Sequence, residues 1–360
     1  MPRQSLGPLW GKAHNLDMAT RSKDNSVPTI VDVARMAGVS IKTVSRVVNV
    51  EAGVHEETRV RVQEAVQRLN YRPKLSARSL AGARSFLIGL FYYDPQASYA
   101  GNVQRGATRA CRAAGYHLLV ESLDREAQDI NDQVQRSLVA LRPDGVILTP
   151  PLCDNEDVLA TLAASNTPVV RLSPRDYRGV HVRIDDRLAA EELTRLLIGL
   201  GHERIGFLGG PEDQIASERR YDGFVSALGA ARLKPSWVGQ GDFTFDTGVQ
   251  AAHQLHGLAE RPTAVFAAND YMALGLIAGA ESLGLSIPGD LSVVGFDDAP
   301  AATLVWPSLT TVRQPLEQMA ELAVQLLLAP TGQAVSCVLP HEIQVRASTA
   351  TWRPKPPPRA

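Results

Sequence analysis

Cysteine is scarce in this 360-residue chain, which has only three. Cys111, Cys153 and Cys337 are scattered without metal-ligand spacing, and their odd number favours a reducing compartment over a disulfide scaffold. We expect each to be a small buried hydrophobic side chain. No apolar run approaches the ~20 residues of a membrane span, and residues 1–27 lack the apolar stretch and cleavage site of a secretory signal. These absences predict a cytoplasmic protein without a membrane partner.

Enzyme signatures are also missing. The eight histidines form no HExxH motif or cysteine–histidine cluster, and neither a GxSxG elbow nor a GxxxxGK(S/T) phosphate loop is present. The carboxylate pairs at 185–186 and 297–298 are sequence neighbours, whereas glycosidase chemistry needs opposed carboxyl groups about 5 to 9.5 Å apart. The sequence therefore predicts no enzyme, no cofactor and no metal site.

Two short amphipathic helices are predicted within residues 29–49, TIVDVARMAGVSIKTVSRVVN. Thr29, with an acid three residues later, favours a cap for a helix over 30–37. Gly38 permits a sharp turn, and Ser40 favours a second cap. The second helix has a buried valine stripe, made of Val44, Val47 and Val48. This pattern is typical of a DNA-reading helix-turn-helix; an ordinary helical hairpin in an unrelated core is the alternative.

The other face of the second helix carries the predicted DNA contacts. In a helix-turn-helix, the N-terminal part of this helix enters the major groove and reads base edges. The predicted base readers are Ile41, Lys42 and Arg46. The predicted contacts to the DNA backbone are Thr29, Ser40, Thr43, Ser45 and Asn49. The sequence thus predicts double-stranded DNA as a partner.

A third predicted helix over 56–69 completes a small all-α domain, and Pro73 ends it. The following KLSARSLAG segment, 74–82, favours a helix but is shorter than the ~12 residues that an isolated helix needs in water. It should therefore fold only against a partner. Two such segments could wedge a leucine into a DNA minor groove. The predicted minor-groove residues are Ala77, Arg78 and Leu80. A plain interdomain linker is the alternative.

Positive charge is concentrated in this region. Residues 28–84 contain ten Lys or Arg against five Asp or Glu, a net charge of +5, although the whole chain has −1. Residues 1–27 add +2, so the remaining residues have a net charge of −8. DNA binding should weaken steeply with salt because bound counterions are released.

The rest of the chain alternates short β-branched apolar runs with amphipathic helical stretches, which indicates parallel sheets covered on both faces. The predicted strands are 86–91, 117–121, 145–149, 169–172, 204–208, 264–267 and 291–296. Ligands of such open sheets bind at the carboxyl ends of the strands. Asn269 and Asp297 are predicted at two such ends, with Asp270 expected to cap the next helix.

Together these features resemble the LacI/GalR family of bacterial transcription regulators, through the 29–49 motif, through NYRPKLSARSLAG at 70–82 and through motifs further along. The likeness extends over about 29–349. One departure is His55, where the family usually caps the third helix with Ser or Thr; we expect a weaker side-chain cap and the same fold.

The resemblance implies an N-terminal all-α helix-turn-helix domain followed by an α/β two-lobed domain like the periplasmic binding proteins, with two parallel sheets and helices on both faces. The implied divisions are 28–73 as the DNA-binding domain, 74–85 as hinge helix and linker, and 86–350 as the effector-binding and dimerisation domain. Composition, and not the resemblance, predicts that 1–27 is a disordered extension, unless the true start lies later, and that 351–360 is a proline-rich tail without a helix. Within 86–350, the first lobe comprises about 86–184 and 314–330, and the second about 185–313 and 331–349.

The resemblance also implies an effector site between the lobes. Arg220, three residues before Gly223, matches the family position that lends an arginine to the effector, and Tyr99 matches a pocket aromatic. Ser173 stands where some members have an aspartate that contacts ligand. The predicted effector-binding residues are Tyr99, Ser173, Arg220, Asn269 and Asp297. An arginine, an amide and a carboxylate together suit vicinal hydroxyls, so we expect a sugar.

Together these expectations predict a homodimeric repressor of carbohydrate uptake or catabolism genes. It would bind a near-palindromic operator, and a small-molecule effector would change its affinity. The last lobe strand is followed by no leucine heptad, so no coiled coil is expected to join dimers. The alternatives are a regulator that responds to a nucleobase or other metabolite, and a transport-type sugar-binding protein.

Overall fold

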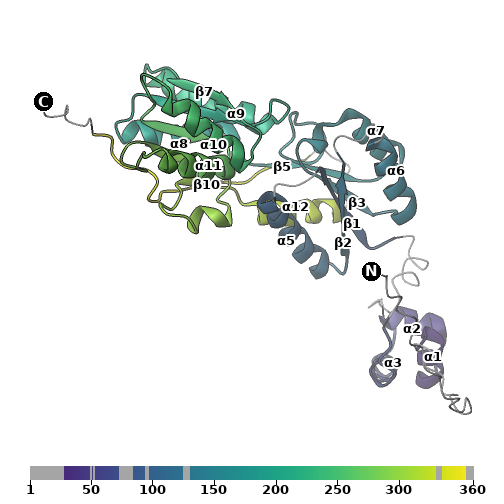
Figure 1. Cartoon of the computed structure of the whole chain (residues 1–360). Coiled ribbons are helices and arrows are strands. Elements are labelled where there is room, and N and C mark those ends of the chain that lie inside the picture. The colour runs from purple at the N-terminus through teal and green to yellow at the C-terminus, as the bar shows by residue number, and fades with distance from the viewer. Residues whose placement is uncertain are drawn as a thin grey trace, which may run out of the picture. The chain divides into compact units, whose positions relative to one another are not determined.

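The computed structural model describes residues 28–48, 51, 53–72, 84–93, 97–124, 130–329 and 335–353. The chain divides into two compact units, residues 1–81 and residues 82–360 (Figure 1). Among the described residues, no helix is both long and apolar enough to cross a membrane. Cys111 and Cys153 are buried as predicted, but Cys337 is only partly buried because it lies in a short edge strand.

The first unit is a bundle of three short helices. These are α1 (Ile30–Ala37), α2 (Ile41–Val48) and α3 (Glu56–Arg68), so the predicted helices are confirmed. Val33, Val44 and Val62 are fully buried at the point where the three helices meet. Helices this short are marginal alone, and the shared valine core stabilises them.

Local capping defines where these helices begin and end. The backbone N–H and the hydroxyl of Thr29 both donate to Oδ2 of Asp32, at 2.9 and 2.7 Å. Gly38 ends α1 in the left-handed conformation with φ of +65°, and Ser40 Oγ accepts from the Thr43 N–H at 3.1 Å. The expected side-chain cap at His55 was wrong: His55 occupies the cap position without a side-chain hydrogen bond, and α3 still begins at the next residue.

The first lobe of the second unit contains a six-stranded parallel sheet in the order β11-β5-β4-β3-β1-β2. Its strands are β1 (Leu87–Tyr93), β2 (His117–Leu123), β3 (Gly145–Leu148), β4 (Val169–Leu172), β5 (His181–Arg183) and β11 (Ser336–Val338). Helices α5 (Ala97–Ala113) and α12 (Leu316–Leu328) pack together on one face, and α6 (Ile130–Leu141) and α7 (Glu156–Ala164) cover the other (Figure 1). Both faces are therefore buried, as the apolar strands predict.

The second lobe contains a four-stranded parallel sheet in the order β7-β6-β8-β9. Its strands are β6 (Ile205–Gly209), β7 (Trp237–Gln240), β8 (Ala264–Ala267) and β9 (Ser292–Val294). Its helices are α8 (Asp186–Gly199), α9 (Ile215–Ala230), α10 (Phe245–His256) and α11 (Asp270–Ser282), which pack as α8 on α9 and α10 on α11. At the α10–α11 contact, a Cβ on Gly275 would lie 1.9 Å from the Phe245 carbonyl oxygen, so only glycine permits this close approach.

The chain crosses between the lobes three times: between β5 and α8, between β10 (Thr311–Arg313) and α12, and between β11 and β12 (Glu342–Gln344). β10 and β12 form a separate antiparallel pair. All seven of these predicted strands exist with small shifts, whereas β5, β7 and β10 were missed, and β11 and β12 were expected only as final strands of the second lobe. The assignment of 331–349 to the second lobe was wrong for β11, because Ser336–Val338 pairs with His181–Arg183 of the first sheet.

Candidate functional site

The second helix of the first unit places the predicted base readers on its surface. Ile41 is 49% exposed, and Lys42 and Arg46 are also exposed, whereas Val44 and Val47 are buried on the opposite side. Arg46 Nε lies 3.9 Å from Oε2 of Glu51, a solvent-exposed pair that contributes little. The helix thus presents an apolar side chain, an ammonium group and a guanidinium group to a partner surface.

The predicted contacts to the DNA backbone lie in several different settings. Thr29 is held in the cap of α1, where it also lowers the pKa of Asp32 through its backbone and side-chain hydrogen bonds. The hydroxyls of Ser40 and Thr43 are 2.8 Å apart at the start of α2. Ser45 is half-buried on the same helix. Asn49, and the minor-groove residues Ala77, Arg78 and Leu80, lie outside the described residues.

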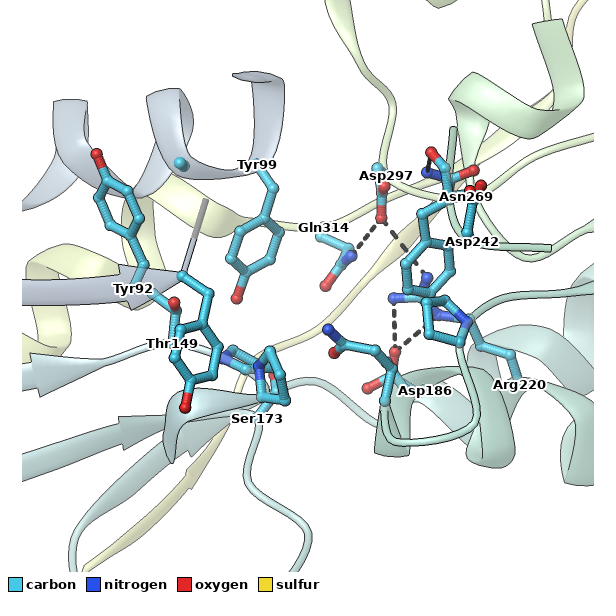
Figure 2. Close-up of a pocket in the computed structure, with 18 of the residues that line it drawn as sticks. Tyr92, Tyr99, Thr149, Ser173, Asp186, Arg220, Asp242, Asn269, Asp297 and Gln314 are labelled. Carbon is cyan, nitrogen blue, oxygen red and sulfur yellow. Dashed lines mark hydrogen bonds and ion pairs between the residues drawn. The ribbon is translucent and has the colours of Figure 1, made fainter. Parts of the chain in front are cut away.

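A cavity of about 440 Å³ opens between the two lobes of the second unit. All five predicted effector-binding residues line it: Tyr99, Ser173, Arg220, Asn269 and Asp297. Tyr99 and Ser173 come from the first lobe, whereas Arg220, Asn269 and Asp297 come from the second (Figure 2). Residues far apart in the sequence meet here because the carboxyl ends of both sheets face this space.

Arg220 is buried and held on three sides. Its Nε and Nη2 both donate to Oδ1 of Asp186 at 3.0 Å, and its Nη1 donates to the Ala268 carbonyl at 2.6 Å. Nη1 also lies 3.8 Å from Oδ1 of Asp297 (Figure 2), and the guanidinium carbon lies 3.7 Å from the centroid of the Phe296 ring. These contacts fix the guanidinium rigidly, because breaking a buried ion pair costs about 3–5 kcal/mol.

Asp297 follows β9 in the left-handed region, with φ of +120°. Its N–H donates to the Val312 carbonyl at 2.8 Å, and its Oδ1 accepts from Nε2 of Gln314 at 2.7 Å. Burial raises the pKa of Asp297 to about 6, against the opposing effect of Arg220. The unusual backbone conformation is maintained by these bonds and turns the carboxylate into the cavity.

Asn269, and not Asp270 as predicted, caps α11. Its Oδ1 accepts from the Met272 N–H at 2.9 Å, and its Nδ2 donates to the Phe243 carbonyl at 3.0 Å. Asp270 is fully buried and accepts from Thr311 Oγ1 and the Ala299 N–H, each at 2.6 Å. Burial raises the pKa of Asp270 well above its usual value. Asn269 therefore combines a structural cap with a place in the cavity wall.

Tyr99 contributes a polar group that has no partner among the described residues. Its hydroxyl oxygen is buried and has no hydrogen bond to any residue in the described ranges. Burial raises the pKa of this hydroxyl well above its usual value, so it is a neutral donor and acceptor. Ser173 is also buried, at φ of +46° directly after β4. An orphaned buried hydroxyl is a group that a ligand can satisfy.

Three acidic or amide residues of the cavity wall were not predicted: Asp186, Asp242 and Gln314. Asp186 was considered only as half of an acidic pair, but the pair has two separate roles. Asp185 caps α8 by accepting from the Leu188 N–H at 3.0 Å, while Asp186 turns to Arg220. The sequence held a signal for the role of Asp186. Asp185 stands at the capping position of α8, so the acid that follows it is not needed as a cap and was a candidate for the cavity wall.

Both units match known families. Residues 29–74 match the bacterial regulatory proteins of the lacI family, and residues 194–349 match the periplasmic binding protein-like domain. The chain is 34% identical to catabolite control protein A of Priestia megaterium over 330 residues, which covers 89% of this chain and 99% of that protein.

Two solved structures are similar over nearly the whole chain. The lac repressor dimer bound to operator and the anti-inducer ONPF has a TM-score of 0.79 and 31% identity, covering 90% of this chain and all of that one. The complex of the transcriptional regulator CelR with cellobiose has a TM-score of 0.68 and 29% identity, covering 89% and 99%. The chain belongs to the LacI family of DNA-binding transcriptional repressors with an effector-binding domain.

Proposed function

We propose that this protein is a cytoplasmic homodimeric repressor of carbohydrate uptake or catabolism genes, which a sugar releases from or fixes to a near-palindromic operator. One observation carries the sugar assignment: the Asp186–Arg220–Asp297 group faces the orphaned hydroxyl of Tyr99 across one cavity. Hydroxyl groups both donate and accept, so a polyol can satisfy carboxylates and a phenol together. The proposal includes no catalytic step.

The operator half of the proposal rests on α2 and on charge. Two copies of α2 would read the two half-sites of the operator through Ile41, Lys42 and Arg46, and Thr29, Ser40, Thr43, Ser45 and Asn49 would hold phosphates. Ala77, Arg78 and Leu80 of each copy would meet in the central minor groove. The net charge of +5 over 28–84 supports this arrangement, since phosphate contacts dominate affinity for DNA.

The regulatory half rests on the position of the cavity. Because the cavity is lined by both lobes, a ligand there would favour one arrangement of the lobes over another. The first lobe follows the hinge segment directly in the sequence, so its movement would change the separation of paired hinges. By linkage, the operator must then change effector affinity by the same factor as the effector changes operator affinity.

Fluorescence anisotropy with the purified full chain tests the proposal. The DNA is the palindrome nearest the protein's own promoter, titrated at two salt concentrations and then against sugars and nucleobases. We expect salt-sensitive, sequence-specific binding that one sugar changes. Absence of sequence-specific binding at both salt concentrations would contradict the operator half, and equal effector affinity with and without operator would contradict the coupling.

A further inference from the structure

The cavity has an excess of negative charge. In the part of the chain that the structure describes, its charged lining residues are Asp186, Arg220, Asp242 and Asp297, three acids against one base. Asp242 lies exposed at the rim, where water screens it, but Asp186 and Arg220 are only 2% and 5% exposed. Charge interactions are strongest in such a buried setting, so an entering anion would be repelled there.

Among the described residues that line the cavity, Arg220 is the only cation, and other protein groups already bind it. Three of its five N–H groups donate to Asp186 and to the Ala268 carbonyl, and Asp297 lies beside Nη1. A phosphate or carboxylate is recognised best by the open fork of a guanidinium. Here one edge of that fork, Nε and Nη2, already faces Asp186, so Arg220 is poorly disposed to neutralise an anionic ligand.

Acceptor atoms, in contrast, are available. Asp186 and Asp297 bond to the protein through Oδ1, and in the part of the chain that the structure describes no hydrogen bond involves either Oδ2. The orphaned Tyr99 hydroxyl lies on the opposite wall of the cavity (Figure 2). Two carboxylate oxygens call for ligand O–H donors, and the phenol can either donate or accept.

From these contacts we propose that the effector is an uncharged polyhydroxyl compound and that Asp186 is the residue that excludes anionic ones, such as phosphorylated sugars. The inference rests on the proposed function and narrows its ligand class. Asp186 acts in two ways: it adds a negative charge to the wall, and it occupies the edge of Arg220 that a phosphate needs. Without the charge of Asp186, the cation of Arg220 becomes available to an anion.

Calorimetric titration of the full-length protein tests the ligand class. The probes are ribose, glucose, galactose, fructose and cellobiose, the monophosphates of the four monosaccharides, and hypoxanthine and guanine. We expect one or more neutral sugars to bind, and the monophosphate of any monosaccharide that binds to bind at least about tenfold more weakly, because a buried like charge opposes it. Failure of every neutral sugar would count against the inference.

The role of Asp186 is tested with Asp186→Asn and with Asp185→Asn as its matched control. Both variants remove one negative charge at neighbouring positions, but Asp185 lies outside the cavity wall, and asparagine caps a helix as well as aspartate does. Asp186→Asn should narrow the affinity ratio between a sugar and its phosphate by about tenfold, whereas Asp185→Asn should leave the ratio unchanged.

The outcomes separate the inference from the proposed function. A phosphorylated sugar or a nucleobase that binds the unmodified protein tightly and changes operator affinity would overturn the inference while supporting an effector-controlled repressor. An unchanged ratio in Asp186→Asn would remove Asp186 from the selecting role. If Asp186→Asn does not fold, the comparison of sugars with phosphates in the unmodified protein still decides the ligand class. No effect of any probe on operator binding would contradict both proposals.

Discussion

Arg175 of the first lobe and Glu218 of the second form an ion pair beside the cavity, with Nη1 and Oε2 2.7 Å apart. The next residue, Arg219, donates from Nη2 to the carbonyl oxygens of Pro174 and Arg175 at 3.0 and 2.8 Å. One turn of α9 therefore both bridges the lobes and supplies Arg220 to the cavity. We infer that these bridges help to hold the lobes in the arrangement seen here.

Because this ion pair helps to hold together the two lobes that line the cavity, Glu218→Gln should weaken effector binding. The loss should be up to about fivefold, since exposed ion pairs contribute roughly 0.2–1 kcal/mol. Calorimetric titration at low and high salt would measure this effect, which should shrink as salt rises. Asp222→Asn, also on the exposed surface of α9, is the control and should leave affinity unchanged. An equal loss of effector affinity in the two variants would show that the loss of one negative charge, and not the loss of the ion pair, weakens binding.

Arg46→Ala should flatten base preference at one position in each half-site, with a loss of about 1–3 kcal/mol of discrimination. Selection from a randomised operator library would measure the preference. Arg68→Ala removes another exposed arginine, from the last turn of α3, and should leave the profile unchanged. A preserved profile in Arg46→Ala would assign base reading to other residues.

Effector affinity should fall with acidity below a pH of about 6, because burial raises the pKa of Asp297 to about 6 and a protonated acid accepts fewer hydrogen bonds. The effect of acidity on the stability of the folded protein has the opposite sign. A raised folded-state pKa means that the native protein binds this proton more tightly than the unfolded chain, so this residue favours folding as pH falls through 6. Calorimetry between pH 5 and 8 would measure the affinity, and a flat profile would exclude an ionised Asp297 from ligand binding.

Val62→Ala should destabilise the helix-turn-helix unit by about 2 kcal/mol, because Val62 is fully buried where α1, α2 and α3 meet. Val60→Ala is the matched control on the same helix, since Val60 is 44% exposed. Operator binding followed during urea titration would report the difference. Equal midpoints for the two variants would contradict the packing described for this core.

Two glycine substitutions should act in opposite directions. Gly275→Ala places a Cβ 1.9 Å from the Phe245 carbonyl oxygen and should cost about 1–3 kcal/mol by forcing α10 and α11 apart. Gly229→Ala on α9 meets nothing within 4 Å and should gain about 0.5–1 kcal/mol from helix propensity. Thermal unfolding of both variants would measure the difference, and a gain in Gly275→Ala would contradict the close helix contact.

The sequence predicted best what short-range chemistry determines. The bounds of α1 and α2 follow from caps and a turn glycine within a few residues, so pattern alone was sufficient. The pairing of Ser336–Val338 with His181–Arg183 spans some 150 residues and leaves no local mark on a three-residue strand. Asp186 was missed for a similar reason: its partner Arg220 lies 34 residues away, and only the folded chain brings them together.

The late return of the chain to the first sheet has a consequence for synthesis. The DNA-reading unit is complete once α3 has left the ribosome, and such units fold as they emerge. The first lobe, in contrast, waits for α12 and for the edge strand β11, which lies near residue 336. A nascent chain therefore carries a folded DNA-binding unit long before its effector-binding domain is complete. A polypeptide that ends before residue 316 would lack α12 and β11, so it would contain the DNA-binding unit without a complete first lobe to control it.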